Sequence, residues 1–344
     1  MSDKSHYHIV AVGNAIVDVI ASCDEETIQK NGMKKGVMQL LFDEDEAKRI
    51  YSVMPAATES SGGSAGNTVA VMAALGAKAG FIGKVADDEL GEIFTHDMRA
   101  IGVEYNTPKL KDSVLTGRSM ILVTPDAERT MNTYLGASVE FEDTDIDADL
   151  IKKGEILYLE GYLFDRDLAK KAFQDAANIA RQANRKVAIT LSDPFCVDRH
   201  REDFQKLIHG SVDIVFANKD EVAALYPDLT LDEAIQKLSS NVEILAMTKG
   251  SEGALIVKDG THTNVDAVDI NVVDTTGAGD AFAAGFIYGF THGYDLEEAG
   301  KLGCACAAKA ISELGARITK DLPEFIKDKT GLDLSQKQSM AKAV

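Results

Sequence analysis

Short runs rich in Val, Ile and Leu recur along the chain, and stretches with helical periodicity lie between most of them. Runs that are apolar at almost every position predict strands buried on both faces, as in a parallel sheet that helices cover. Five such runs are HIVAVG from His8, EILYLEG from Glu155, KVAITLSD from Lys186, DIVFAN from Asp213 and EILAMTKG from Glu243. The intervening helices include 167–182 and 232–239. The pattern therefore predicts an α/β fold of three layers, in which helices lie on both faces of a doubly wound, mostly parallel sheet.

Two regions, 15–58 and 103–135, break this alternation with shorter and more β-like patterns. In the second region, the segments GRSMILVT and ERTMNTYLG flank PDAE, which predicts a β-hairpin. We assign both regions to one small β-rich lid over the edge of the sheet, because both leave and rejoin the main fold near glycine-rich motifs. The expected organisation is a single α/β domain over 1–344, with the lid inserted as these two excursions.

Charge narrows the range of partners. The 344 residues include 55 acidic and 36 basic side chains, which gives a formal net charge of −19. Such a field repels nucleic acid and anionic lipid surfaces, so we expect neither as a partner. A phosphorylated ligand would have to be held by local donors.

The four cysteines lack the spacing of a zinc site or a disulfide scaffold, and neither a signal peptide nor an apolar run of about twenty residues occurs. We expect a cytoplasmic protein.

The segment DTTGAGD precedes AFAAGFIYGF, a small and apolar stretch of helical length. Its glycines therefore lie at the N-terminus of a predicted helix, where unpaired N–H groups and the helix dipole favour an anion. Gly277, Ala278 and Gly279 would let a phosphoryl group approach their backbone amides closely, which predicts an anion hole. Asp280 is placed where an incoming hydroxyl would meet that phosphoryl group. Taken alone, the motif would also suit a glycine turn with an ordinary capping acid.

A second glycine cluster, SSGGSAGNTVAVM from Ser60, also leads into a predicted helix. Gly62 and Gly63 would let the backbone approach a ligand, Ser64 is the expected N-cap, and Asn67 projects an amide from the first turn. This cluster predicts part of a substrate site.

The first predicted strand ends in NAIVD, which places Asn14 and Asp18 at its carboxyl end. Ligands of doubly wound sheets bind at that edge. A carboxylate and an amide together can hold a vicinal diol, because the carboxylate accepts from both hydroxyls and the amide can donate or accept. The chain has neither the P-loop pattern nor a G-x-G-x-x-G after its first strand, which argues against two common nucleotide sites.

Both glycine clusters together resemble the signatures of the ribokinase-like (PfkB) carbohydrate and nucleoside kinase family. GGSAGNTVAVMAALGAKAGFIGKVADDELG resembles the first family signature, and DTTGAGDAFAAGF resembles the second. The order of strands and helices is also similar over about 7–325. The resemblance implies transfer of the γ-phosphoryl group of ATP to a primary hydroxyl of a sugar or nucleoside, with Mg²⁺ as a cofactor. In many relatives a monovalent cation such as K⁺ also takes part.

The resemblance also implies roles for individual residues. Asp280 matches the catalytic base of the family, and Gly277, Ala278 and Gly279 match its anion hole. The NKDE segment matches a family motif in which Asn218 contributes to the ATP site and Glu221 helps to organise Mg²⁺ through water. From the residues alone, this segment is a capped helix start.

Three further matches extend the site. Asp274 matches a position that holds a monovalent cation in many relatives. Arg129 resembles an arginine that reaches the phosphates as the lid closes, although an arginine exposed at a hairpin tip would look the same in sequence. Thr248 and Gly250 fall in MTKGSEGALI, which resembles the stretch beside the ATP nucleoside.

Two segments are similar to adenosine kinases of this family. GNAIVD is similar to their ribose-contacting segment, and TLSDPFCV to a segment that helps to enclose the substrate base. Phe195 and Phe164, with Ile16 and Leu40 from the lid, could form an apolar slot in which stacking on a base contributes about 1–3 kcal/mol. Ordinary core packing would explain the two phenylalanines equally simply.

Three functions remain open. The favoured one is a nucleoside kinase that forms a 5′-monophosphate, with adenosine as the substrate and AMP as the product. A kinase for ribose, fructose or a related ketose is the alternative within the class. A nucleoside-binding sensor without catalysis is the alternative from another class, although an intact GAGD motif argues against it. The sequence leaves open which nucleoside or sugar binds and whether the protein is a monomer or a homodimer.

Overall fold

The computed structural model describes residues 6–126, 128–165, 167–318 and 321–335. Within these residues, the larger of two sheets has nine strands in the order β14-β13-β12-β11-β10-β9-β1-β5-β6. The pairs that join the first seven strands in chain order are all parallel, and the two pairs at one edge, β12 with β13 and β13 with β14, are antiparallel. The strands are β1 (Tyr7–Val12), β5 (Ala79–Ile82), β6 (Glu104–Tyr105), β9 (Gly154–Glu160), β10 (Lys186–Thr190), β11 (Ile214–Asn218), β12 (Ile244–Thr248), β13 (Ala254–Lys258) and β14 (Thr261–Val265).

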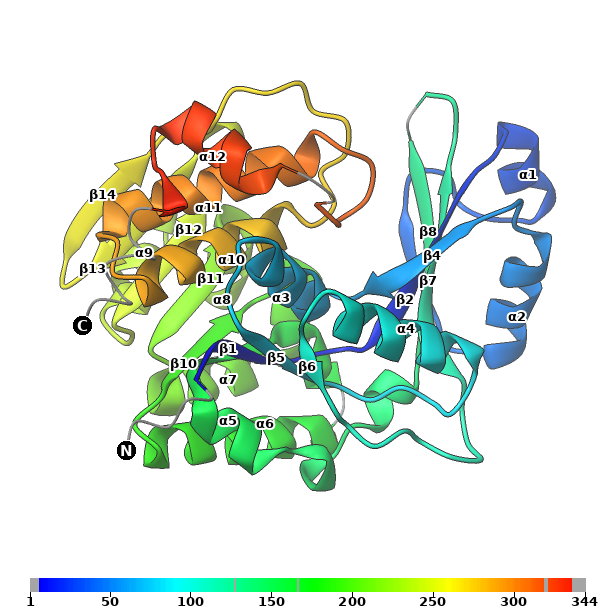
Figure 1. Cartoon of the computed structure of the whole chain (residues 1–344), viewed down its shortest axis with the longest axis horizontal. Helices are drawn as coiled ribbons and strands as arrows, with labels where there is room; N and C mark the ends of the chain where they lie inside the picture. Colours follow the sequence, from blue (N-terminus) through cyan, green and yellow to red (C-terminus); the bar gives the residue numbers. More distant parts are fainter. Residues whose placement is uncertain (1–5, 127, 166, 319–320, 336–344) are drawn as a thin grey trace.

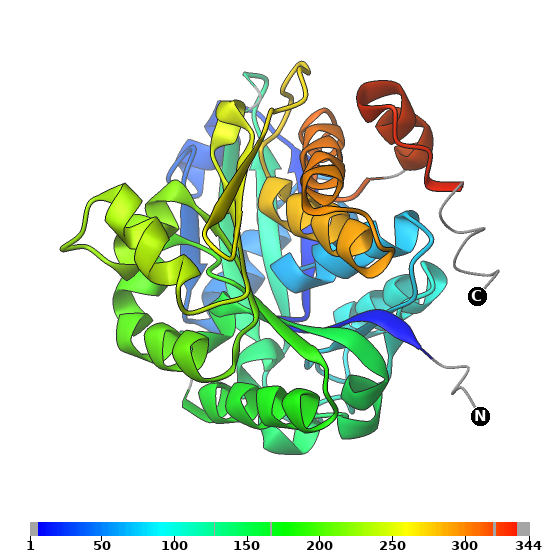
Figure 2. The same ribbon diagram turned by 90° about the vertical axis from the view of Figure 1, so that its left-hand side faces the viewer.

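Helices cover both faces of this sheet (Figure 2). One face packs against α3 (Ser64–Ala74), α4 (Glu89–Ala100), α10 (Ala278–Thr291), α11 (Leu296–Ile311) and α12 (Leu322–Thr330). The other packs against α5 (Ala148–Lys153), α6 (Asp167–Gln182), α7 (Pro194–Ser211), α8 (Lys219–Leu225) and α9 (Leu231–Ser239). Along β1, Ile9 and Ala11 enter the first core, whereas Val10 and Val12 enter the second. β1 is thus buried on both sides, which explains why it is apolar at almost every position. Helices on both faces of the sheet confirm the predicted three-layer fold.

The smaller sheet, called the small sheet below, has five strands in the order β3-β8-β7-β2-β4 in the described part of the chain. They are β2 (Ile16–Ser22), β3 (Met38–Leu41), β4 (Thr58–Gly62), β7 (Thr116–Val123) and β8 (Arg129–Gly136). The predicted hairpin is present, because β7 and β8 pair antiparallel on either side of Pro125.

One face of the small sheet packs against two short helices, α1 (Glu25–Lys30) and α2 (Glu44–Val53), and forms a third apolar core. In Figure 1 these helices lie on the side of the small sheet that faces away from α3 and α10. The opposite face is therefore left to face the large domain. Short 3-10 turns complete the description, at Ala137–Glu140, Asp143–Asp145, Gly161–Asp165 and Gly250–Glu252. Among the helices described, none is both long and apolar enough to cross a bilayer.

Candidate active site

A cavity of about 900 Å³ lies between the small sheet, the carboxyl ends of the parallel strands and the N-termini of α3 and α10. Its size suits one or two small organic ligands, and its position is the usual one for ligands of doubly wound sheets. The sequence-predicted site residues that line it are Asn14, Ile16, Asp18, Leu40, Gly63, Ser64, Asn67, Phe195, Asn218, Glu221, Thr248, Gly250, Gly277, Ala278, Gly279 and Asp280. Four predicted residues lie outside its wall: Gly62, Arg129, Phe164 and Asp274.

The glycine turn before α10 has the geometry of an anion site. Gly277 is the N-cap of this 14-residue helix and has φ +74°, a left-handed conformation that favours glycine. A Cβ atom there would also lie 2.7 Å from the Cβ of Ala316. At Gly279 a Cβ would meet open space. The N–H groups of Gly279 and Asp280 donate to no acceptor in the described part of the chain, so they remain available to an anion at the positive end of the helix.

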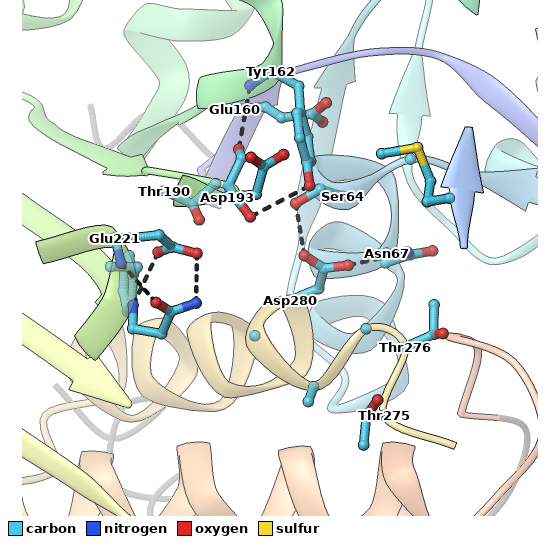
Figure 3. A pocket seen from close by; sticks show the side chains of 18 of the residues that line it. Ser64, Asn67, Glu160, Tyr162, Thr190, Asp193, Glu221, Thr275, Thr276 and Asp280 are labelled. Carbon is cyan, nitrogen blue, oxygen red and sulfur yellow. Dashed lines mark hydrogen bonds between the residues drawn. The ribbon is translucent and has the colours of Figure 1, made fainter. Parts of the chain in front are cut away.

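Asp280 lies in the first turn of α10 and faces the first turn of α3. Its two carboxylate oxygens accept hydrogen bonds from Ser64 Oγ at 2.6 Å and Asn67 Nδ2 at 3.0 Å (Figure 3). Desolvation raises the pKa of Asp280 to about 6, although both hydrogen bonds and the charge of Arg317 oppose this rise. A carboxylate with this pKa is still ionised near neutral pH and is a stronger base than an exposed aspartate.

The predicted N-cap of α3 was wrong by one residue. Gly63, with φ +85°, is the N-cap, and Ser64 is the first helical residue. A Cβ at Gly63 would collide with the carbonyl oxygen of Asn14, so only glycine fits where the two segments cross. The hydroxyl of Ser64 is thereby free to bond to Asp280 rather than to its own helix.

Asn14 and Asp18 lie on the cavity wall where β1 leads into β2. Desolvation raises the pKa of Asp18 to about 6, and the nearby Asp280 carboxylate adds to the rise, whereas Arg317 opposes it. Gly62 does not touch the cavity, but a side chain there would come within 2.5 Å of the Asp18 carboxyl carbon. Among the described residues, no hydrogen bond reaches the buried Oδ1 atoms of Asn14 and Asn67. These two acceptors suit ligand hydroxyls.

Glu160 is a cavity residue that the sequence reasoning missed. It is 1% exposed, ends β9 and accepts hydrogen bonds from Asn14 Nδ2 and the Ala65 N–H, both at 2.8 Å. Burial raises the pKa of its carboxyl to about 7, against the effect of these hydrogen bonds. Its sequence signal was its place at the carboxyl end of a predicted strand, the criterion already applied to Asn14.

At the other end of the cavity, Asn218 and Glu221 form a reciprocal cap at the start of α8. Glu221 accepts from the backbone N–H and the Nδ2 of Asn218, and the Asn218 side chain accepts from the Glu221 N–H. Burial raises the pKa of Glu221 to about 7. Both carboxylate oxygens already accept hydrogen bonds, so an Mg²⁺ ion would contact this residue best through water, as Mg²⁺ often does when it is bound to phosphates. Thr248 and Gly250 line the same end.

Arg129 and Asp274 lie close together and form a salt bridge that joins the small sheet to the glycine turn. Arg129 Nη1 also donates to Thr276 Oγ1 at 2.7 Å. The Asp274 carboxylate accepts from the N–H groups of Thr276 and Gly315, at 3.0 and 2.8 Å. Arg129 is thus beside the glycine turn, and its guanidinium is paired with the Asp274 carboxylate.

The two phenylalanines predicted for an apolar slot lie in different environments. Phe195 is 76% exposed and lines the cavity. Phe164 is only 2% exposed and stacks on Phe204 in the core beneath α7, with ring centroids 4.3 Å apart. The placement of Phe164 in the slot is therefore contradicted, because its ring fills the layer between sheet and helix. Ile16 and Leu40 line the cavity as expected, together with Met38, Ile121, Met131 and Leu135 of the small sheet.

These environments predict opposite outcomes for two substitutions. Phe164→Ala should lower the free energy of unfolding by about 3–5 kcal/mol, because it removes a fully buried ring. Phe195→Ala should change it by less than about 0.5 kcal/mol, because the ring is mostly in solvent. Urea titration of both variants at one temperature measures the difference. Equal losses of stability would contradict the distinction between the two positions.

Comparisons with known proteins agree with this geometry. Residues 8–323 match the pfkB family of carbohydrate kinases. The structure is similar to that of a "probable sugar kinase protein" from Rhizobium etli CFN 42, with 45% identity, 99% of this chain and 100% of that one covered, and a TM-score of 0.85. It is also similar to adenosine kinase from Sinorhizobium meliloti, with 46% identity, coverage of 97% and 99%, and a TM-score of 0.84. An "uncharacterized sugar kinase" from Archaeoglobus fulgidus is 32% identical over 245 residues, which are 71% of this chain and 95% of that relative.

Proposed function

Because the chain belongs to the pfkB family of carbohydrate kinases, and is thus a phosphotransferase with an alcohol acceptor, we propose that it phosphorylates the 5′-hydroxyl of a nucleoside. The proposed substrate is adenosine and the proposed product is AMP. Membership of the family implies ATP as the phosphoryl donor.

The observation that carries the proposal is the apolar wall that the small sheet contributes to the cavity. Six apolar side chains of the small sheet line the same cavity as Asn14 and Asp18: Ile16, Met38, Leu40, Ile121, Met131 and Leu135. A planar base gains hydrophobic contact from such a wall, at about 25 cal/mol per Å² of apolar surface buried. A free sugar has little apolar surface to bury there. The likeness to an adenosine kinase at 46% identity supports the same choice.

The chain's own residues suggest how transfer would proceed. Asn14 and Asp18 would hold the ribose hydroxyls, and Asp280 would orient the 5′-hydroxyl and accept its proton late in the transfer. The free N–H groups of Gly279 and Asp280 would stabilise charge on the transferring phosphoryl group. Because the transition state of phosphoryl transfer is loose, orientation and charge stabilisation contribute more than the strength of the base.

Two cations enter the proposal. Mg²⁺ would neutralise charge on the ATP phosphates, and Glu221 would hold it through water at the cavity wall. Asp274 stays a proposed contact for a monovalent cation such as K⁺, next to the glycine turn. Its carboxylate is already bonded to two backbone N–H groups, which fixes its orientation toward the turn.

The hydrogen bond from Ser64 gives a prediction for the pH dependence of catalysis. Asp280 acts as a base only when it is ionised, so kcat/KM should fall as the pH drops through its pKa of about 6. Ser64→Ala removes a donor to the ionised form and should raise this pKa, which moves the acid limb up by roughly one pH unit. A series of kcat/KM measurements from pH 5 to 8 tests this. An acid limb at the same pH in both proteins would contradict it, and Ser64→Thr, which retains a hydroxyl, is the control.

A sugar kinase is the second candidate, because Asn14, Asp18 and the buried Glu160 offer several acceptors to a polyol. The sugar kinase relatives favour the same reading. A non-catalytic nucleoside sensor would bind ligand in the same cavity without turnover.

The deciding experiment measures ATP consumption with Mg²⁺ across a panel of nucleosides and free sugars, with and without K⁺. Turnover of adenosine with formation of AMP is the expected result. Exclusive turnover of a ketose or ribose would replace the nucleoside proposal by the sugar kinase. Tight nucleoside binding without any ATP consumption would favour the sensor.

A further inference from the structure

The cavity face of the small sheet is apolar except for one row of side chains. In the strand register, Asp18 of β2 pairs with Ser119 of β7, Ser119 pairs with Thr133 of β8, and Thr133 pairs with Leu40 of β3. Cross-strand partners project from the same face of a sheet, and all four residues line the cavity. The row therefore leads from a carboxylate, across two hydroxyls, to a leucine.

Apolar residues border this row on both sides. Two residues farther along each strand, Ile121 of β7 and Met131 of β8 lie on one side of the row, whereas Ile16 of β2 and Leu135 of β8 lie on the other. The face of the small sheet that lines the cavity is therefore apolar, with one narrow polar row across its middle.

Ser119 and Thr133 are hydrogen-bonded to each other. Their hydroxyl oxygens are 3.0 Å apart, either can be the donor, and the side chains belong to residues that are 2% and 8% exposed. Two hydroxyls carry two hydrogens, and the mutual bond uses one. Within the described residues, the second hydrogen has no acceptor. A buried donor without a partner costs free energy, so a ligand group that pairs with it would bind favourably.

The position of the pair indicates which part of a ligand it meets. Neighbouring strands are about 4.8 Å apart, so Thr133 lies about 10 Å along the row from Asp18. If Asp18 holds ribose hydroxyls, as the proposed function has it, a base attached to that ribose can extend along the row toward the two hydroxyls. The apolar side chains on either side would then contact its faces and the remaining edges.

We propose that Ser119 and Thr133 bind the polar edge of the substrate's base and so determine which nucleosides the enzyme accepts. This inference rests on the proposed nucleoside kinase activity. Hydroxyl groups rotate, so the pair can offer a donor beside an acceptor in either order. It can match the amino group and ring nitrogen of adenine, and also the carbonyl and ring N–H of a 6-oxopurine. The pair would discriminate against a purine that has no exocyclic polar group.

The test compares kcat/KM for adenosine, inosine and purine riboside, which lacks the 6-substituent. The wild-type protein should prefer adenosine and inosine to purine riboside by roughly tenfold, as expected when a buried hydrogen-bonding group is left unpaired. Ser119→Ala and Thr133→Val should each lower kcat/KM for the first two substrates by roughly tenfold and change that for purine riboside by less than about threefold. Thr133→Ser retains the hydroxyl and should keep most of the preference.

Two outcomes would overturn the inference. An equal loss for all three nucleosides would show that the pair only supports the small sheet, and an unchanged preference in both variants would show that the base lies elsewhere. Ser119→Ala removes a single oxygen atom, so it remains a fair test even if Thr133→Val lowers the melting temperature. A wild-type protein that phosphorylates free sugars but no nucleoside would instead reject the proposed function, and this inference with it.

Discussion

Asp280→Asn should lower kcat by roughly 10²- to 10⁴-fold, the effect typical of losing a general base. The amide has the shape of the carboxylate and can still accept one hydrogen bond from Ser64 or Asn67, so the neighbouring first turns of α3 and α10 should stay in place. What is lost is the ionised carboxylate that, in the proposed mechanism, orients the acceptor hydroxyl and takes its proton. Single-turnover kinetics with saturating ATP and nucleoside would isolate the chemical step.

Three measurements make the interpretation of Asp280→Asn specific. The affinity for ATP, measured by calorimetry, should change little, because the contacts that we propose for ATP are backbone N–H groups of the glycine turn and residues at the other end of the cavity. Asp97→Asn is a matched control: this carboxylate accepts hydrogen bonds from Ser61 and does not line the cavity, so kcat should stay within a few-fold. Turnover of Asp280→Asn within a factor of ten of wild type would remove the assignment of the base.

Asp280→Asn also has an expected effect on stability, of opposite sign to its effect on activity. The pKa of Asp280 in the fold, about 6, lies above the value of 3.8 for an unperturbed aspartate. The folded state therefore binds its proton more tightly than the unfolded state, and the ionised carboxylate opposes folding above about pH 6. A neutral amide should raise the melting temperature at pH 7 and have little effect near pH 4. A variant that is both inactive and less stable at pH 7 would point to disrupted structure instead.

Gly279→Asp should raise the dissociation constant for ATP by at least roughly 100-fold. The new carboxylate would lie in open space beside two free N–H groups, where we place the phosphates. Two like charges about 4 Å apart repel by roughly 4 kcal/mol at an effective dielectric constant of 20, which corresponds to about a thousandfold in affinity. Acidic residues in the first turn of a helix stabilise it, so the fold should not suffer.

Gly279→Asn is the matched control, because it has the same size without the charge. It should weaken ATP binding far less than Gly279→Asp does. The ratio of the two dissociation constants for ATP then measures the electrostatic contribution to the loss of affinity. By contrast, Gly277→Ala should destabilise the protein, because Gly277 has a left-handed backbone and lies against Ala316. If Asp and Asn at position 279 weakened ATP binding equally, the phosphates would not lie at this turn.

The sequence was most informative where one stretch of chain determined the structure by itself. Strands such as β10 were recognisable because a strand covered on both faces must be apolar throughout. The turn at Gly277 and the carboxylate of Asp280 were found because helix N-terminus, glycines and acid are adjacent in sequence. The hydrogen bond between Ser64 and Asp280 was not predicted, because more than two hundred residues separate them in sequence.

The misses all involve contacts between distant segments. A phenylalanine after a strand can line the cavity, as Phe195 does, or fill the layer beneath, as Phe164 does, and the local sequence does not distinguish the two cases. Glu160 looked like an ordinary strand end until Asn14 and the N–H of Ala65 were seen to converge on it. Arg317, which donates to the carbonyls of Ser61 and Gly66 beneath the site, had no local motif to mark it.

The salt bridge between Arg129 and Asp274 has a thermodynamic consequence. One partner belongs to the strand that carries Thr133 and Leu135, and the other precedes the turn at Gly277. The pair therefore joins the side of the cavity where we place the nucleoside to the turn where we place the ATP phosphates. A ligand that draws the Arg129 guanidinium away from the Asp274 carboxylate would change the free energy of binding on both sides of the cavity. Linkage then requires that each substrate alter the affinity for the other by the same factor, so the two binding events should be cooperative rather than independent.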